Sequence, residues 1–153
     1  NNVKIYGGPR NQDWCRDGKA GQQRFWRNIF AGHAAVRFHR PPTGIGISEE
    51  ALCQIRSLRL FIDRVDFFTM IPSNELIGRR GANEAYCLAN RSSELALYFP
   101  AHGDISLNAP EGEYEMSRLC LQTGMWNSLG TVQLPGGVTT DTNDSHILLL
   151  VRK

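Results

Sequence analysis

The chain has 153 residues, of which 41% are hydrophobic and 21% are charged, and its formal net charge is +2. These values are ordinary for a globular protein. The small net charge argues against a dedicated nucleic-acid binder, and no apolar run approaches the roughly 20 residues needed to cross a bilayer. We therefore expect neither nucleic acid nor a membrane as a partner.

The charge is unevenly spread along the chain. Up to Pro72 there are eleven Lys and Arg against six Asp and Glu, a balance of +5, and from Ser73 there are six against nine, a balance of −3. This asymmetry indicates two regions.

The first predicted element is a short strand over Val3–Tyr6, where apolar and polar residues alternate before Gly7-Gly8-Pro9 ends the run. A polar loop follows, and Trp14 is its only large apolar side chain. Such a Trp is a candidate stacking surface for a sugar ring, although it can equally cover the edge of a core.

A helix is predicted over Gly21–His33 from its broad apolar stripe, and a strand over 34–38 is stopped by Pro41-Pro42. The basic side chains near the end of this strand are Arg37, His39 and Arg40. In α/β proteins the carboxyl ends of strands are where sites are built. Solvated surface residues are the alternative interpretation of these three.

A second helix is predicted to begin after Ser48, which is a suitable amino-cap. It has an amphipathic pattern that suits packing on a sheet. The apolar positions of that pattern are Leu52, Ile55, Leu58, Ile62 and Val65.

From Glu84 onward the sequence changes to short β-type runs separated by turn signals, which favours an antiparallel sandwich. The predicted strands are 84–89, 94–99, 104–108, 113–121, 126–134, 138–140 and 146–152. The four cysteines form no Cys-x-x-Cys pair, so we expect no zinc or other metal site and no cofactor. Buried free thiols are favoured over a disulfide for them.

Four sequence runs resemble the carboxyl-terminal part of a bacterial family of glycoside-hydrolase-like proteins. They are RFWRNIFAG at 24–32, RFHRPPTGIG at 37–46, NEAYCLAN at 83–90 and YFP at 98–100. In that family a (β/α)8 barrel is followed by a small β-sandwich that is named as a collagen-binding domain. The resemblance implies that residues 1–6 are the seventh barrel strand, 34–39 the eighth, and 84 onward the sandwich.

The expected fold class is therefore α+β, with terminal βα units of a (β/α)8-type barrel followed by a small antiparallel β-sandwich. Residues 1–72 would be the last two βα units, 73–82 a linker, and 83–153 the sandwich. Because a closed barrel needs eight units, the rest of the barrel would have to be supplied in cis or by a partner chain. The chain is thus expected to be a fragment, or one whose partner completes it. The alternative is that the first strand pairs differently and a compact α+β domain results.

The resemblance also implies a carboxylate nucleophile after the seventh strand and an acid/base carboxylate after the fourth. Here the seventh-strand region carries Lys4 and no carboxylate, and the fourth strand is absent. The nearest carboxylates, Asp13 and Asp17, are more typical of a solvated loop. Since ordinary glycoside hydrolysis needs two carboxylates, the catalytic residues stay unknown and the enzymatic status of this chain stays open.

The residues that we expect in a substrate-binding floor are Lys4, Tyr6, Trp14, Arg37, His39 and Arg40. Their cationic groups favour acidic sugars. The leading hypothesis is the tail of a hydrolase that acts on polysaccharide or oligosaccharide and is inactive alone.

Two alternatives stay open. One is a non-catalytic module that binds a glycan or a protein through the aromatic side chains of the predicted sandwich, and the other is a purely structural sandwich. The aromatic residues concerned are Tyr86, Tyr98, Tyr114 and Trp126. Strand alternation favours core packing for many of them. The sequence leaves the compartment undetermined, with secretion or a periplasmic location compatible.

Overall fold

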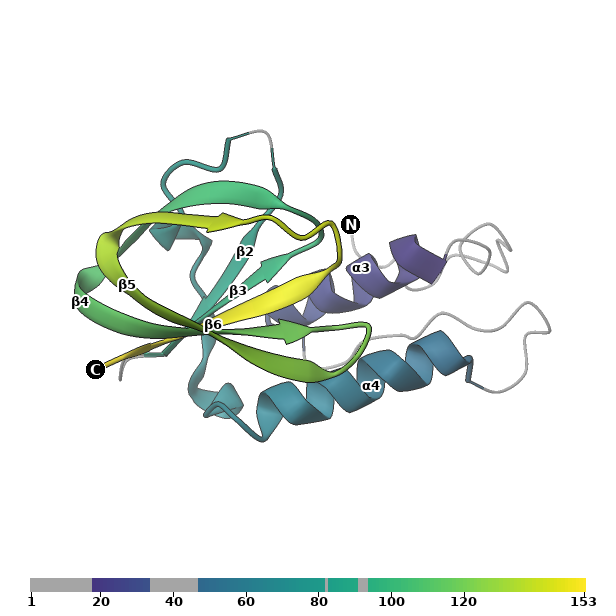
Figure 1. Ribbon diagram of the computed structural model, residues 1–153. Helices are drawn as coiled ribbons and strands as arrows, with labels where there is room; N and C mark the ends of the chain where they lie inside the picture. Colours follow the sequence, from purple (N-terminus) through teal and green to yellow (C-terminus); the bar gives the residue numbers. More distant parts are fainter. Residues whose placement is uncertain (1–17, 34–46, 82, 91–93) are drawn as a thin grey trace.

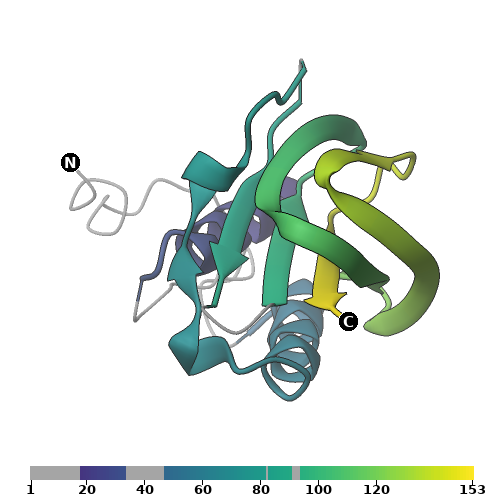
Figure 2. The same ribbon diagram turned by 90° about the vertical axis from the view of Figure 1, so that its left-hand side faces the viewer.

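A computed structural model describes residues 18–33, 47–81, 83–90 and 94–153. This part of the chain forms two α-helices and one six-stranded antiparallel sheet with the strand order β1-β2-β3-β6-β4-β5. Both helices lie on the same side of the sheet (Figures 1 and 2). No helix among these residues is both long and apolar enough to span a bilayer.

The helices are α3 (Gly18–Phe30) and α4 (Glu49–Ile62). The strands are β1 (Ile71–Pro72), β2 (Tyr86–Ala89), β3 (Glu94–Phe99), β4 (Gly103–Cys120), β5 (Met125–Thr140) and β6 (His146–Arg152). Two 3-10 turns, Phe67–Thr69 and Asn74–Leu76, flank β1.

The long hairpin of β4 and β5 bends the sheet over itself. Its pairing register shifts between Leu107 and Gly112 and again between Met116 and Ser117. Only the second part of β4, from Tyr114 on, pairs with β6. The first part of β4 turns away from β6, and its Leu107 forms an isolated bridge with Ile77. The curved hairpin can be followed in front of β2, β3 and β6 in Figure 1.

The bend buries the central strands on both faces. Along β3, Leu95, Leu97 and Phe99 enter a core beneath the hairpin, whereas Ala96 and Tyr98 enter a second core beneath the helices. Strands buried on both faces are apolar almost throughout rather than alternating, which explains the LALYF run of β3 and the ILLLV run of β6.

The aromatic stripe of α3 fills the second core. Phe25, Trp26, Ile29 and Phe30 are all buried there, as the spacing of the sequence predicts. The helix ends at Phe30, however, so the predicted last member of the stripe, His33, lies beyond it and is exposed. The ring of Phe30 stacks on Phe61 of α4 at a centroid distance of 6.1 Å. The side chains of α3 therefore join both α4 and the sheet.

Helix α4 begins as predicted, but the face that it buries only partly matches the predicted stripe. The Ser48 hydroxyl accepts a hydrogen bond from the amide of Ala51 at 3.2 Å, which confirms the amino-cap. The side chains that α4 buries are Ala51, Gln54, Ser57 and Phe61. Of the predicted stripe, Val65 is buried just beyond the helix and Leu58 packs against the same core, while the other members are half-buried. Polar groups can occupy this face because the carbonyl of Leu121 accepts from Gln54 Nε2 at 3.2 Å and from Ser57 Oγ at 3.1 Å.

The predicted fold class is wrong. The described strands form a single antiparallel sheet on which both helices pack, instead of barrel βα units followed by a separate two-sheet sandwich. The runs at 110–112 and 135–137 look like turns in the sequence, but the chain stays extended through both inside β4 and β5. Seven short predicted strands therefore become fewer and longer ones.

The predicted strands at 1–6 and 34–39 lie outside the described residues. The proposed boundaries at 72 and 83 stay a prediction.

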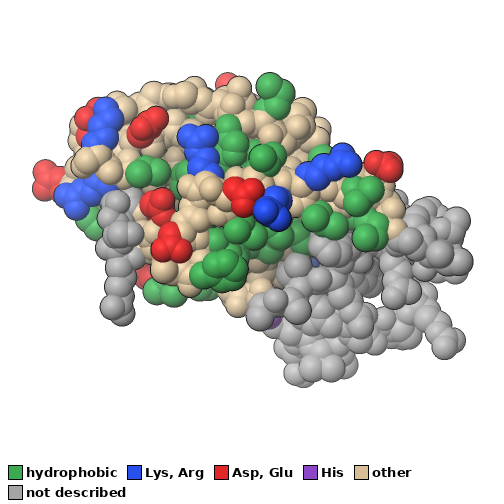
Figure 3. Space-filling model, turned by 90° about the horizontal axis from the view of Figure 1, so that it is seen from below, with side chains coloured by type: hydrophobic (Ala, Val, Ile, Leu, Met, Phe, Trp, Pro, Cys, Tyr) green, Lys and Arg blue, Asp and Glu red, His purple; other side chains and the backbone are tan. Residues whose placement is uncertain are grey.

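One face of the molecule, seen in Figure 3, carries a band of hydrophobic side chains beside charged ones. The large hydrophobic residues that are exposed on the described surface are Ile47, Leu60, Phe68, Ile71, Met125 and Leu129. Leu60 of α4 lies 3.2 Å from the position that a Cβ on Gly124 would take, so α4 and the β4–β5 turn are in close contact.

Replacing a buried Phe and an exposed Phe by Ala should lower the free energy of unfolding by unequal amounts. Phe30→Ala removes a fully buried ring and should lower the free energy of unfolding by about 3–5 kcal/mol. Phe68→Ala removes a ring that is 88% exposed and should change it by less than about 0.5 kcal/mol. Urea unfolding of both variants measures the difference, and equal losses would contradict the packing described here.

Candidate functional site

The residues predicted for the substrate-binding floor all lie outside the described part of the chain. These are Lys4, Tyr6, Trp14, Arg37, His39 and Arg40. Asp13 and Asp17 lie outside it as well. The substrate-binding floor therefore stays a prediction.

The described residues form a polar pocket of about 260 Å³ where the amino-terminal ends of α3 and α4 meet two turns of the sheet. Its lining residues are Lys19, Gln22, Glu50, Gln122, Asn143, Asp144 and Ser145. The first two belong to α3 and Glu50 to α4, while Gln122 is in the β4–β5 turn and the last three are in the β5–β6 loop.

Backbone and side-chain hydrogen bonds hold the β4–β5 turn in place. The Leu121 amide donates to the carbonyl of Ser145 at 3.3 Å, which joins the two turns. On the opposite side, the Cys53 thiol donates to the carbonyl of Gln122 at 2.9 Å. The turn is thereby fixed between α4 and the β5–β6 loop, and Gln122 is held at the pocket.

A buried histidine supports the β5–β6 loop from beneath. His146 Nδ1 lies 2.7 Å from the carbonyl of Asp144, and Nε2 lies 2.8 Å from the Thr140 hydroxyl. Because a carbonyl can only accept, Nδ1 carries the proton and Nε2 accepts from Thr140. Burial lowers the pKa of His146, so the ring is neutral and its stacking on Phe99 at 5.4 Å is undisturbed.

The lining side chains are oriented by their own contacts. Gln122 Nε2 donates to Asp144 Oδ1 at 3.2 Å, and the amide oxygen of Gln122 takes no part in that hydrogen bond. Asn143 Oδ1 lies 2.6 Å from His102 Nδ1, which leaves the Asn143 amide N–H groups to point elsewhere. The lining therefore contains amide and carboxylate groups, which are able to hydrogen-bond to hydroxyl groups.

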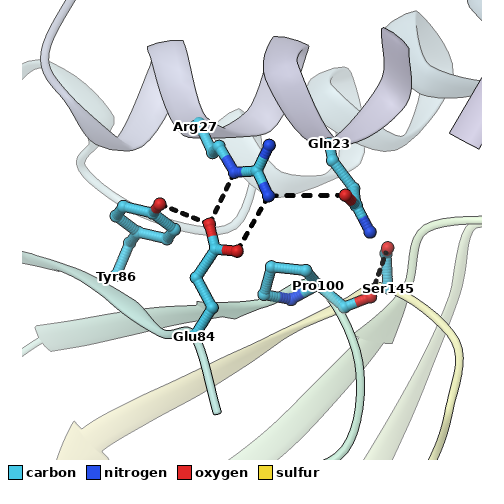
Figure 4. Close-up of polar contacts among 6 residues, drawn as sticks. All are labelled: Gln23, Arg27, Glu84, Tyr86, Pro100 and Ser145. Atoms are coloured by element: carbon cyan, nitrogen blue, oxygen red, sulfur yellow. Dashed lines mark hydrogen bonds and ion pairs between the residues drawn. The ribbon is translucent and has the colours of Figure 1, made fainter. Parts of the chain in front are cut away.

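A second polar cluster joins α3 to the strand β2 (Figure 4). Arg27 Nε and Nη2 contact the two carboxylate oxygens of Glu84 at 2.5 and 2.8 Å, and the Tyr86 hydroxyl donates to the same carboxylate. The hydrogen bond from Arg27 lowers the pKa of Glu84, while the hydrogen bond to Glu84 raises the pKa of Arg27. A carboxylate that is held ionised by a bidentate guanidinium is unsuited to act as a general acid, and its contacts link α3 to the segment that enters β2.

The described cysteines are thiols, and their burial differs from one to the next. Cys87 is buried and burial raises its pKa to about 12, whereas Cys53 and Cys120 are half-buried. Within the described ranges, no group of three or more His, Cys, Asp and Glu side chains is placed to hold a metal ion.

Sequence reasoning missed the pocket because four separate segments build it. The only local signal is the polar run Asn143-Asp144-Ser145 between two predicted strands, which reads as an ordinary turn. The contacts of Gln122 with Asp144 and with α4 depend on the bent sheet, which the sequence did not indicate.

Comparison with solved structures shows a likeness to parts of glycoside hydrolases. A crystal structure of a glycoside hydrolase family 5 protein from Bacteroides vulgatus ATCC 8482 matches with a TM-score of 0.71 and 12% sequence identity, over 89% of this chain and 36% of that chain. A second structure, described as a glycoside hydrolase, matches with a TM-score of 0.69 and 14% identity, over 90% of this chain and 37% of that chain. At these identities the likeness shows the fold alone, and this chain spans little more than a third of either structure. No protein-family model and no curated protein matches the sequence.

The ion pair of Arg27 and Glu84 predicts a pH dependence of stability. The pKa of Glu84 is lower in the folded chain than in the unfolded chain, so its contribution is present above the unfolded value and is lost as the pH falls through the folded value. The difference in unfolding free energy between the parent chain and Glu84→Gln should therefore shrink on acidification. Glu115→Gln, at an exposed position of β4, controls for the change in net charge. A difference between the parent and Glu84→Gln that is constant from neutral to acidic pH would contradict the assignment.

Proposed function

We propose that this chain is part of a glycoside hydrolase that acts on polysaccharide or oligosaccharide, and that its polar pocket binds carbohydrate. The pocket carries the proposal, because it combines amide and carboxylate groups on a frame fixed by the contacts of Leu121, Gln122 and His146. The likeness to parts of two glycoside hydrolase structures supports it.

The chain alone is proposed to be catalytically inactive. Two carboxylates that flank the scissile bond are needed for ordinary glycoside hydrolysis, and one of the pair must be able to give up a proton. Glu84 is committed to Arg27 and is held ionised. The catalytic residues are therefore proposed to lie on further polypeptide, in cis or in a partner chain.

The exposed hydrophobic side chains next to α4 favour contact with such polypeptide (Figure 3). The predicted floor residues Lys4, Tyr6, Trp14, Arg37, His39 and Arg40 belong to the segments that lead into α3 and α4. Because the pocket lies at the start of both helices, we propose that these residues extend the same carbohydrate site. A preference for acidic sugars at that extension stays a prediction that depends on the basic side chains.

Binding of collagen or another protein through the aromatic residues is less well supported. Tyr98 and Tyr114 are fully buried in the two cores, and Tyr86 and Trp126 are half-buried. The guanidinium of Arg64 covers the ring of Trp126 at 4.6 Å from its centroid. These four side chains do not form an exposed flat platform.

Affinity electrophoresis in gels that contain soluble polysaccharides tests the proposal. The parent chain should be retarded by at least one polysaccharide, and Gln122→Ala and Asn143→Ala should each weaken the retardation by about threefold to tenfold, since each removes a neutral hydrogen bond. Gln133→Ala removes an exposed amide from β5 outside the pocket and should behave as the parent does. Retardation that is unchanged in both pocket variants would contradict the proposed site.

A further inference from the structure

The two edges of the six-stranded sheet differ in length. At one edge, β1 consists only of Ile71 and Pro72, so it offers little backbone for pairing with another strand. At the other edge, β5 runs for 16 residues and pairs, among the described strands, with β4 only. This strand forms the right-hand margin of the molecule in Figure 2.

The outer edge of β5 is accessible over residues 125–134. Of these residues only Leu134 is buried, while Trp126 and Val132 are half-buried and the others are exposed. No backbone hydrogen bond within the described part of the chain joins this stretch to an element other than β4. Alternate residues of an edge strand direct their N–H and C=O groups away from the neighbouring strand, so a row of donors and acceptors faces outward here.

The strand β5 has none of the charged side chains that commonly keep an edge strand from pairing. It contains no Asp, Glu, Lys or Arg, whereas the neighbouring β4 contains both acidic and basic residues. Its irregular points are a register shift beside Leu129 and Pro135, which has no N–H. Between them, residues 130–134 pair with β4 without interruption, so a regular stretch of edge stays open to a further strand.

A second copy of β5 matches this edge in charge. When two such strands pair antiparallel about a two-fold axis, one uncharged edge meets another. The charged side chains of the two β4 strands are then separated by three strand spacings, about 14 Å, which exceeds the screening length of about 8 Å at physiological salt. A charged peptide, in contrast, would find no ion-pair partner on β5 itself.

Exposed apolar side chains at the same edge add to the contact. Met125 and Leu129 belong to β5, and Leu60 of α4 lies against the turn that leads into it. Covering part of this apolar surface favours association. A single pair of strands with a small apolar contribution makes an interface below the standard size, so the association should be weak.

We infer that β5 is an interface at which two copies of this chain pair edge to edge, so that their two sheets become one continuous sheet. The inference uses the backbone and the uncharged sequence of β5. It is independent of carbohydrate binding, because none of the residues that line the polar pocket belongs to β5.

Sedimentation equilibrium at increasing protein concentration tests the inference. The apparent mass should rise from the 17.2 kDa of one chain towards twice that value. The dissociation constant should be on the order of 10–100 µM, as for a small transient interface.

A lysine on the edge should weaken the dimer. Gln133 is exposed and lies opposite Glu113 of β4, so Gln133→Lys is compatible with folding. It should raise the dissociation constant about tenfold, because lysine is a residue that keeps edge strands from pairing. Glu75→Gln changes the net charge by the same amount in the turn after β1, at the opposite edge of the sheet, and should dimerise as the parent does.

Hydrogen exchange locates the contact. Backbone amides within residues 125–134 should exchange more slowly as the protein concentration rises, whereas exchange in β3, in the middle of the sheet, should not change. An apparent mass that stays at one chain up to about 1 mM, tenfold above the expected dissociation constant, would overturn the inference. So would a dimer that Gln133→Lys leaves intact and whose β5 amides exchange independently of concentration, because the contact would then lie elsewhere.

Discussion

Burial of the central strands on both faces is the constraint on which the rest of this structure depends. β3 and β6 cannot face water on either side, because their side chains are apolar almost without interruption. The helices cover one face and the bent β4–β5 hairpin covers the other. If either cover were lost, a row of Leu, Ile and aromatic side chains would be exposed, at roughly 1.5–3 kcal/mol for each large side chain.

The same constraint places the pocket. Because α4 packs beside the hairpin, the carbonyl of Leu121 receives hydrogen bonds from Gln54 and Ser57, each worth about 0.5–1.5 kcal/mol. Trp26 of α3 donates to Gln54 at 2.6 Å, so both helices are tied to this turn. The polar groups of Gln122, which follows Leu121, and of the β5–β6 loop are therefore fixed by contacts with the core. This favours a preorganised binding site.

The sequence predicted the local elements better than their assembly. The stripe of α3, the cap at Ser48 and the apolar strands β3 and β6 depend on spacing and composition within one segment, and the structure confirms them. The buried face of α4 was predicted only in part, because the burial of Gln54 and Ser57 depends on a carbonyl some 65 residues away. The single bent sheet and the pocket were missed for the same reason. Both arise from contacts between segments that are distant in the sequence, and no local sequence pattern predicts such contacts.

The most direct test of the central claim is a crystal structure of the chain soaked with an oligosaccharide that retards it in affinity electrophoresis. We predict a sugar ring between the starts of α3 and α4 and the turns that carry Gln122 and Asn143, with a ring hydroxyl within hydrogen-bond distance of Asp144. Sugar density on another surface, with the pocket holding only solvent, would contradict the account.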